Sequence, residues 1–172
     1  LMGPTERVTE TYMRQTRIER PHASWELDEA PGDDLARILA VRAASVDGAP
    51  SSAFNLSEPV ALMLDYWIGG SGGRVNPVFS ITNSAGLVVF STSNYYDPEW
   101  GACSYRPGVY RGVCVVPGHV LNEGNYFATA MIVHEAGQVR AHVENAVEFW
   151  VDDDGMLRGD YVGGWRRVGK EC

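Results

Sequence analysis

The chain has 172 residues, of which 45% are apolar, and a formal net charge of −8. This length favours one folded domain with an appendage, and an acidic chain without a basic stripe argues against a nucleic-acid partner. No run of about 18 apolar residues and no signal-peptide pattern occurs, so we expect no membrane span. The odd set of cysteines, Cys103, Cys114 and Cys172, favours a reduced, cytoplasmic setting, although Cys103 and Cys114 could pair if oxidised.

The first 34 residues are expected to lie outside the main domain. A proline in the first turn, Pro4, and an early acid, Glu6, predict a helix that runs to about Arg17. Residues 20–34 are interrupted by proline and rich in acids, which is typical of a linker. We therefore assign residues 1–34 to a linker helix and an acidic linker.

Alternation of apolar and polar residues predicts strands along the next hundred residues. Residues 35–46 fit a helix by propensity but end in a hairpin-type turn signal, so we predict a first strand there. A second strand is expected at 60–68, and a hairpin with an Asn-Ser-Ala-Gly turn at 77–90. Further strands are expected at 108–116, 126–133 and 139–151.

These elements predict an all-β fold, an antiparallel β-sandwich that occupies residues 35–155. A glycine-rich tail follows over residues 156–172. In the strand 60–68, alternation directs Asp65 and Trp67 away from the core. In the strand 139–151, it directs Trp150 outward and the following side chains into the core: Val143, Asn145, Val147, Phe149 and Val151.

A long irregular segment, residues 91–107, is rich in aromatic residues, and such loops are often functional. Aromatic rings supply flat apolar platforms for sugar rings, and amide, carboxylate and guanidinium groups bind hydroxyls. Outward-facing residues and residues in or beside this loop therefore form the candidate glycan-binding set: Asp65, Trp67, Asn94, Tyr95, Tyr96, Trp100, Arg106, Arg111 and Trp150.

Two other interpretations stay open. Aromatic residues and arginine are also enriched at subunit interfaces, so Trp67 and Trp150 fit a structural sandwich that serves dimerisation or docking equally well. A glycosidase-type carboxylate pair is the enzymatic alternative, with Asp65, Glu144 and Glu148 as its candidates. The sequence has no nucleophile elbow and no metal-ligand spacing, so we expect no catalytic residue, metal or cofactor.

Several short motifs follow one another in a set order: Phe54-x-x-x-Glu58, Pro77-x-Phe79-x-Ile81, Gly86-x-x-Val89-Phe90, Pro117-x-x-x-Leu121-x-x-Gly124-x-Tyr126 and Ala146-x-x-Phe149-x-Val151. Their order resembles that of the C-terminal carbohydrate-binding domain of Wzt-type polysaccharide ABC transporters, over nearly all of the chain. This resemblance implies an immunoglobulin-like or jelly-roll sandwich that is not an enzyme, forms a homodimer, and binds the exported O-antigen glycan so that its recognition is coupled to ATP-driven export.

The same resemblance implies the partners and the location. It places an ABC ATPase domain upstream in the full-length chain, beside a membrane permease, on the cytoplasmic side and peripheral to the inner membrane. The segment Gly164–Glu171 fits the Walker A spacing but has Glu171 where Ser or Thr should bind magnesium. No sugar-site motif of the family maps onto this sequence, so the candidate glycan-binding set depends on side-chain chemistry.

Overall fold

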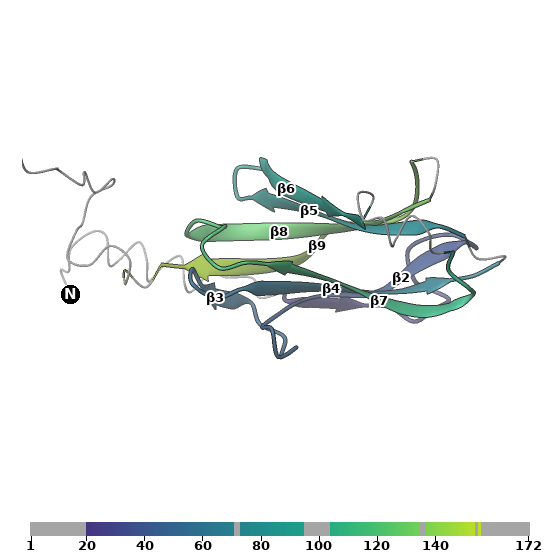
Figure 1. Ribbon diagram of the computed structural model, residues 1–172, viewed down its shortest axis with the longest axis horizontal. Coiled ribbons are helices and arrows are strands. Elements are labelled where there is room, and N and C mark those ends of the chain that lie inside the picture. The colour runs from purple at the N-terminus through teal and green to yellow at the C-terminus, as the bar shows by residue number, and fades with distance from the viewer. Residues whose placement is uncertain (1–19, 71–72, 95–103, 135–136, 154, 156–172) are drawn as a thin grey trace, which may run out of the picture.

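The computed structural model describes residues 20–70, 73–94, 104–134, 137–153 and 155. Within these ranges the chain forms nine strands and no helix. None of the described residues belongs to a helix that is long and apolar enough to cross a membrane. Figure 1 shows the strands in two stacked layers, which confirms the predicted all-β sandwich. The expected N-terminal helix and C-terminal tail lie outside the described residues.

The strands are β1 (His22–Ser24), β2 (Ala36–Ala44), β3 (Ala53–Asn55), β4 (Val60–Ile68), β5 (Val75–Asn83), β6 (Val88–Ser93), β7 (Gly108–Val116), β8 (Gly124–His134) and β9 (Gln138–Asp152). Sheet A has the order β1-β2-β4-β7, and sheet B has the order β3-β9-β8-β5-β6. Neighbouring strands are antiparallel, except that β3 runs parallel to β9. Across the core, β2 packs against β9 and β8.

The core lies between the inner faces of the two sheets. Sheet A contributes Leu62 and Tyr66, and sheet B contributes Ile132 and Phe149, all of them fully buried. Burial of one such side chain stabilises the fold by about 1.5–3 kcal/mol. Phe54 of β3 meets Phe149 edge to face, with ring centroids 5.8 Å apart, so the short strand β3 is fixed to the core as well.

The strands expected from alternation are confirmed. The ambiguous segment 35–46 contains β2, and the predicted strands at 60–68 and 108–116 coincide with β4 and β7. The β5–β6 hairpin forms where Asn83 accepts the backbone N–H groups of Ala85 and Leu87 with its side-chain oxygen, each at 3.0 Å. Gly86 adopts a φ of 75° there, a conformation that glycine allows without strain.

The first strand lies in the segment for which the sequence predicts a linker. Residues His22–Ser24 pair with β2, with His22 opposite Arg42. A strand of three residues is too short to show a period of two, so its sequence carries no strand signal. The division of the chain after residue 34 stays a prediction.

The last strand departs from regular alternation. Val147 and Phe149 point into the core as predicted, but Asn145 is exposed and Ala146 is buried in its place. The pairing of β8 with β9 shifts in register between Ala128 and Ala130. The prediction that Asn145 faces the core is therefore wrong, because a β-bulge interrupts the strand at this residue.

Candidate functional site

Three members of the predicted glycan-binding set lie on the outer face of sheet A: Asp65, Trp67 and Arg111. Asp65 and Arg111 are directly paired residues of β4 and β7. The Asp65 carboxylate accepts hydrogen bonds from Arg42 Nη2 and from Arg111, whose Nη2 lies 2.9 Å from Asp65 Oδ2. The Asp65 side chain is 15% exposed, so both of its oxygens are engaged with these guanidinium groups.

The charge of Asp65 follows from this arrangement. Burial by itself raises the pKa of the Asp65 carboxyl, but the hydrogen bond from Arg111 and the positive charge of Arg42 outweigh burial and hold the pKa below its usual value. Asp65 is therefore ionised near neutral pH and already neutralised by its partners. A ligand hydroxyl would have to displace a charge-assisted bond to reach it.

The two tryptophans expected on outer faces belong to different sheets. Trp67 lies on sheet A, with its indole ring against the backbone of Gly69, where an added Cβ would meet the ring at 1.9 Å. Trp150 lies on the outer face of sheet B, and its Nε1 donates to Asp152 Oδ1 at 2.7 Å. The core separates the two rings, so they cannot form one platform.

The rest of the predicted set is dispersed. Asn94 donates its backbone N–H to Asn76 Oδ1 at 2.9 Å at the end of β6. The backbone carbonyl of Arg106 accepts the Tyr110 hydroxyl at 2.8 Å before β7, and the side chains of Asn94 and Arg106 are exposed. Three further members lie outside the described residues: Tyr95, Tyr96 and Trp100.

A pocket of about 290 Å³ opens at the seam between the sheets, where β1 and Trp25 face the β9 bulge. We call it the seam pocket. None of the predicted glycan-binding residues lines it. Its walls are made by Arg20, His22, Ala23, Ser24, Trp25, Val143, Glu144, Asn145 and Ala146.

The bulge forms one wall of the seam pocket. Ala128 pairs with Val147 and Ala130 with Val143, so three residues of β9 lie opposite Thr129 alone. Asn145 has a φ of 47°, a left-handed conformation that costs energy for any residue except glycine but that asparagine tolerates better than most. This bulge leaves two consecutive polar residues, Glu144 and Asn145, exposed at the seam.

Backbone hydrogen bonds fix the opposite wall. The N–H of Glu148 donates to the carbonyl of Arg20 at 2.9 Å, which holds the chain before β1 against β9. The N–H of Trp25 donates to the carbonyl of Leu39 at 2.8 Å, where β2 has its own irregularity. Trp25 is half-buried and packs partly against the core, so its ring is a fixed surface.

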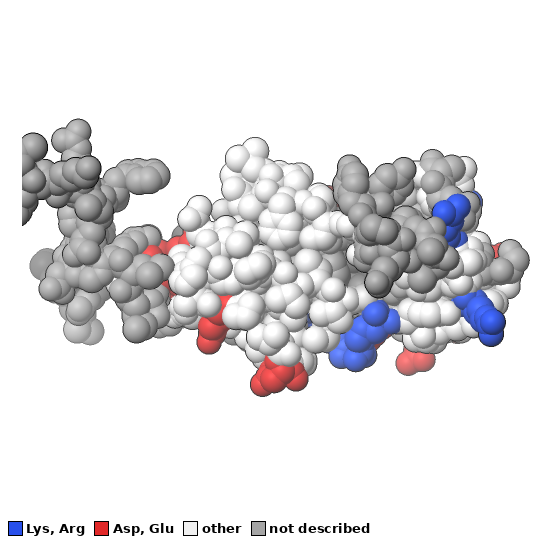
Figure 2. Space-filling model, in the orientation of Figure 1, with Lys and Arg blue, Asp and Glu red and all other residues white. Residues whose placement is uncertain are grey.

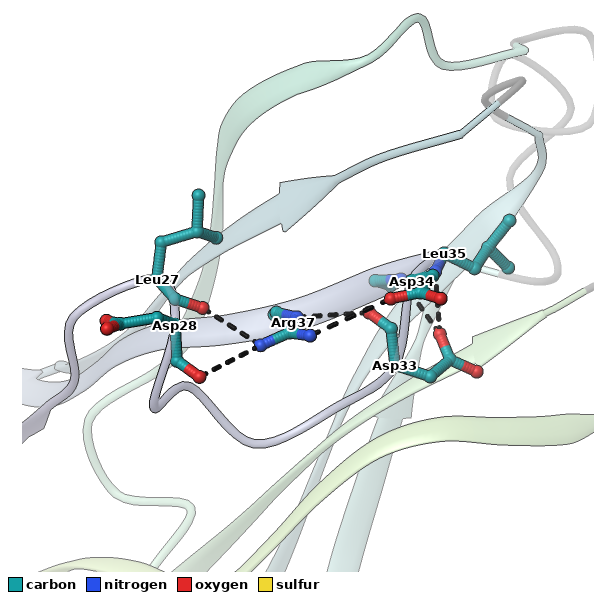
Figure 3. A network of polar contacts seen from close by, with 7 residues as sticks. Leu27, Asp28, Asp33, Asp34, Leu35 and Arg37 are labelled. Carbon is teal, nitrogen blue, oxygen red and sulfur yellow. Dashed lines mark hydrogen bonds and ion pairs between the residues drawn. The ribbon is translucent and has the colours of Figure 1, made fainter.

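The loop after Trp25 is held against β2 by one guanidinium group (Figure 3). Arg37 Nη1 donates to the carbonyl oxygens of Leu27 at 3.0 Å and Asp28 at 3.3 Å. Arg37 Nε donates to the carbonyl of Asp33 at 3.3 Å, and Arg37 Nη2 lies 3.8 Å from an Asp34 oxygen. A planar fork with five donors suits this task, and lysine could not replace it.

Asp33 closes the same loop at its far end. Its Oδ1 accepts the backbone N–H groups of Leu35 at 2.8 Å and Ala36 at 3.1 Å, and its Oδ2 lies 3.3 Å from Arg140 Nη1 of β9. Burial alone raises the pKa of Asp33, but these hydrogen bonds outweigh it and leave the pKa below its usual value. An ionised Asp33 therefore ties the loop to both sheets.

The polar side chains that line the seam pocket have no hydrogen-bond partner among the described residues. Those of Arg20, His22, Ser24, Glu144 and Asn145 make no hydrogen bond or ion pair with any described residue. A rigid aromatic surface beside hydroxyl, carboxylate, amide and cationic groups can bind a small ligand that is rich in hydroxyls. This contrasts with Asp65, whose two oxygens already accept three hydrogen bonds from arginine side chains.

Of the three carboxylates that the sequence suggested for a glycosidase, one lines the seam pocket among the described residues, that of Glu144. Asp65 lies on the outer face of sheet A, Glu144 lies at the seam, and Glu148 on sheet B accepts a hydrogen bond from Asn125. A hydrolytic pair must face one bond from two sides. Asp65 cannot join either glutamate at the seam pocket.

Sequence reasoning missed most of this pocket. His22, Ser24 and Trp25 lie in the segment expected to be a linker, and Asn145 was expected in the core. One signal could have indicated the site, since a tryptophan in a polar, proline-containing segment needs a surface to pack against.

Comparisons with known proteins identify one solved domain that has a similar fold. No family model matches the chain, and no curated protein matches it. The solved structure described as the crystal structure of the C-terminal domain of Wzt matches with a TM-score of 0.60 and 17% identity, and the match covers 79% of this chain and 80% of that one. A target of the Northeast Structural Genomics Consortium matches at 15% identity over 78% of this chain and 98% of that one, with a TM-score of only 0.30. The chain therefore has the β-sandwich fold of the C-terminal domain of Wzt, as the order of its sequence motifs predicted.

Proposed function

We propose that this chain is a non-catalytic glycan-recognition domain of a polysaccharide ABC exporter, and that the seam pocket is its sugar site. The observation that carries the proposal is a set of five polar side chains beside Trp25 that have no hydrogen bond or ion pair with any described residue. The fold shared with the C-terminal domain of Wzt supports the exporter context. On the side shown in Figure 2, most of the surface formed by described residues is uncharged, which suits a neutral polymer.

The pocket chemistry explains how a sugar would bind. The apolar side of a pyranose ring packs on Trp25, while Glu144 accepts hydrogen bonds from ring hydroxyls and Asn145 both donates and accepts them. A volume of about 290 Å³ lies at the lower end of the range for small-ligand sites. The site therefore holds a short stretch of polymer, and weak binding is expected because the pocket is open to water.

In the proposed context, binding of the polymer reports its presence to the transport machinery. The ATPase domain lies in the same full-length chain, the permease subunit lies in the inner membrane, and this domain acts on the cytoplasmic side as a homodimer. Glu144 is the acidic residue that lines the seam pocket among the described residues, and recognition of the polymer requires no second one.

The test is a titration of the 172-residue chain with an array of bacterial O-polysaccharide fragments. Trp25→Ala and Glu144→Gln should each weaken binding by at least about tenfold, because each removes one of the main contacts. Glu144 is exposed, so its replacement should leave the fold intact. Matched controls are Trp150→Ala on the outer face of sheet B and Glu123→Gln in an exposed turn, which should bind like the parent. Equal affinity in all four variants would remove the sugar site from the seam.

The second candidate function is a structural domain that serves dimerisation or docking without sugar binding. The observation that favours it is the apolar outer face of sheet A, where Val109, Val113 and Val115 are exposed on β7. A folded, dimeric parent without affinity for any fragment would favour this candidate over glycan recognition.

A further inference from the structure

The outer face of sheet B is uncharged over three adjacent strands. In Figure 1, β6, β5, β8 and β9 lie in one layer, and they are neighbours in the sheet in this order reversed, β9-β8-β5-β6. The strands β5, β6 and β8 contain no Asp, Glu, Lys or Arg residue, although 21% of the residues in the chain are charged. Charged side chains are the usual residues of a solvated surface, so their absence over three strands indicates a surface that contacts more than water.

A row of hydroxyl groups crosses this face. Thr129 of β8 pairs with Ser80 of β5, and Ser80 pairs with Ser91 of β6. Ala128 and Phe79, which precede Thr129 and Ser80, are buried in the core, so the two hydroxyl side chains point outward. The Ser91 hydroxyl lies 3.2 Å from that of Ser80, on the same side of the sheet. We call Thr129, Ser80 and Ser91 the hydroxyl row.

The hydroxyl row begins at the seam pocket. Asn145 lines that pocket, and its backbone N–H donates to the Thr129 hydroxyl at 3.1 Å. From β9 the row then crosses to β6, the edge strand of sheet B. Three spacings of about 4.8 Å between neighbouring strands make this path roughly 14 Å long. The seam pocket and the hydroxyl row therefore form one continuous polar path.

Two hydroxyls of the row keep a free donor. Thr129 accepts the N–H of Asn145, and Ser80 accepts the hydroxyl of Ser91. A hydroxyl has one O–H donor besides its two acceptor positions, and the O–H groups of Thr129 and Ser80 have no acceptor among the described residues. Both groups can therefore donate to a ligand that lies on the sheet.

Apolar side chains flank the hydroxyl row. On β8, Phe127 and Met131 lie two residues before and after Thr129, and both are half-buried on the outer face. On β5, Val78 flanks Ser80 in the same way. A sugar ring has apolar C–H faces and hydroxyls at its rim, so its faces can pack on the flanking side chains while its hydroxyls bond to the row.

We propose that a neutral glycan chain too long for the seam pocket continues along the hydroxyl row to Ser91, so that this domain selects polymer over single sugars. The proposal rests on the seam pocket being the sugar site and adds a second contact surface to it. The row itself selects this occupant. An apolar partner would leave the donors of Thr129 and Ser80 unpaired, and a charged polymer would find no Asp, Glu, Lys or Arg residue on β5, β6 or β8.

The experiment is a titration of the 172-residue chain with uncharged O-polysaccharide fragments that are separated by length. Affinity of the parent should rise at least about tenfold with length and level off once a fragment spans the row. Ser80→Lys places a long charged side chain across the row, so it should abolish this gain and leave the affinity for the shortest fragments unchanged. Ser80→Ala removes one hydroxyl, and it should weaken binding of the long fragments alone by about fivefold.

The matched control is Ser84→Lys, because Ser84 belongs to the exposed turn of the same hairpin and lies outside the row. This variant should keep the full gain with length. Trp25→Ala should weaken short and long fragments alike, since it acts at the seam pocket. Circular dichroism checks that Ser80→Lys is folded, and Ser80→Ala decides the question if it is not.

Each result decides the proposal. A gain with length that Ser80→Lys abolishes and Ser84→Lys keeps would support it. Equal affinity for all lengths would overturn it while the seam pocket stayed the sugar site, and so would a gain that persists in Ser80→Lys, which would come from repeated epitopes on long fragments. If Ser80→Lys changes the sedimentation of the chain without ligand, this face contacts another copy and the proposal is wrong. Absence of binding by every fragment would overturn both the row and the seam pocket.

Discussion

Asn145 donates its backbone N–H to the hydroxyl oxygen of Thr129 at 3.1 Å. This bond joins the bulge of β9 to the neighbouring strand β8. Without an acceptor at this position, the bulge would expose an unpaired backbone donor on the outer face of sheet B. The shape of the seam pocket therefore depends on a threonine that does not line it.

Thr129→Val should loosen the bulge, because valine keeps the shape of threonine but lacks the hydroxyl oxygen. The expected loss is about 1 kcal/mol of unfolding free energy, the usual value of one hydrogen bond. Binding of O-polysaccharide fragments should weaken in parallel, since Glu144 and Asn145 lose their fixed positions. Urea denaturation and fragment titration measure the two effects. Thr82→Val on β5 is the matched control, and equal effects of both changes would contradict this role of Thr129.

Asn145→Gly should separate stability from binding. Glycine adopts a φ of 47° without the strain that asparagine bears, so the free energy of unfolding should stay equal or rise by up to about 1 kcal/mol. Glycan binding should fall because the amide is lost. Asn145→Ala is the comparison, and it should lower both stability and affinity. A variant Asn145→Gly that binds like the parent would remove this amide from the sugar site.

The ion pairs of Asp65 should make stability depend on pH at the acid end. The folded state lowers the pKa of Asp65, so the stabilisation is present above the ordinary carboxyl pKa of about 3.9 and is lost as the pH falls through and below that value. Asp65→Asn should cost about 1–3 kcal/mol at neutral pH, because Arg42 and Arg111 lose a charged acceptor. This difference from the parent should shrink toward pH 3 in denaturation experiments. A difference that stays constant with pH would contradict the assigned charge of Asp65.

Arg37 should control the order of the loop that follows Trp25. Arg37→Ala removes the donor that holds the carbonyls of Leu27 and Asp28, and amide hydrogen exchange in residues 26–34 should become faster. Arg37→Lys should rescue little, since an ammonium group cannot span the same acceptors as a planar fork. The control is Arg106→Ala, because Arg106 contacts Tyr110 through its carbonyl and not through its side chain. Unchanged exchange in Arg37→Ala would show that backbone bonds alone fix the loop.

Sequence patterns predicted the sandwich because its long strands bury one face each. The segment 60–68 keeps a period of two from Leu62 to Ile68 in its burial, and its strand bounds and its inner set, including Leu62 and Tyr66, are confirmed. The segment 35–46 is less regular because β2 contains a register shift between Ile38 and Ala40. Its turn signal still identified it as a strand.

The seam pocket could not be predicted in the same way. Its position depends on contacts between distant segments, such as the bond from Glu148 to Arg20, which no local pattern encodes. The bulge depends on a left-handed Asn145, and the period of two places this residue in the core. Alternation also gives only the side of a strand and not the sheet to which it belongs, so Trp67 and Trp150 looked alike although they lie on opposite outer faces.

The most direct measurement of the central claim is an NMR titration of the isotope-labelled chain with O-polysaccharide fragments. The account predicts that backbone amide signals of residues 20, 22–25 and 143–146 shift together and saturate, along with the indole N–H signal of Trp25. Saturable shifts confined to β4 and β7 around Trp67, with those seam residues unchanged, would contradict it.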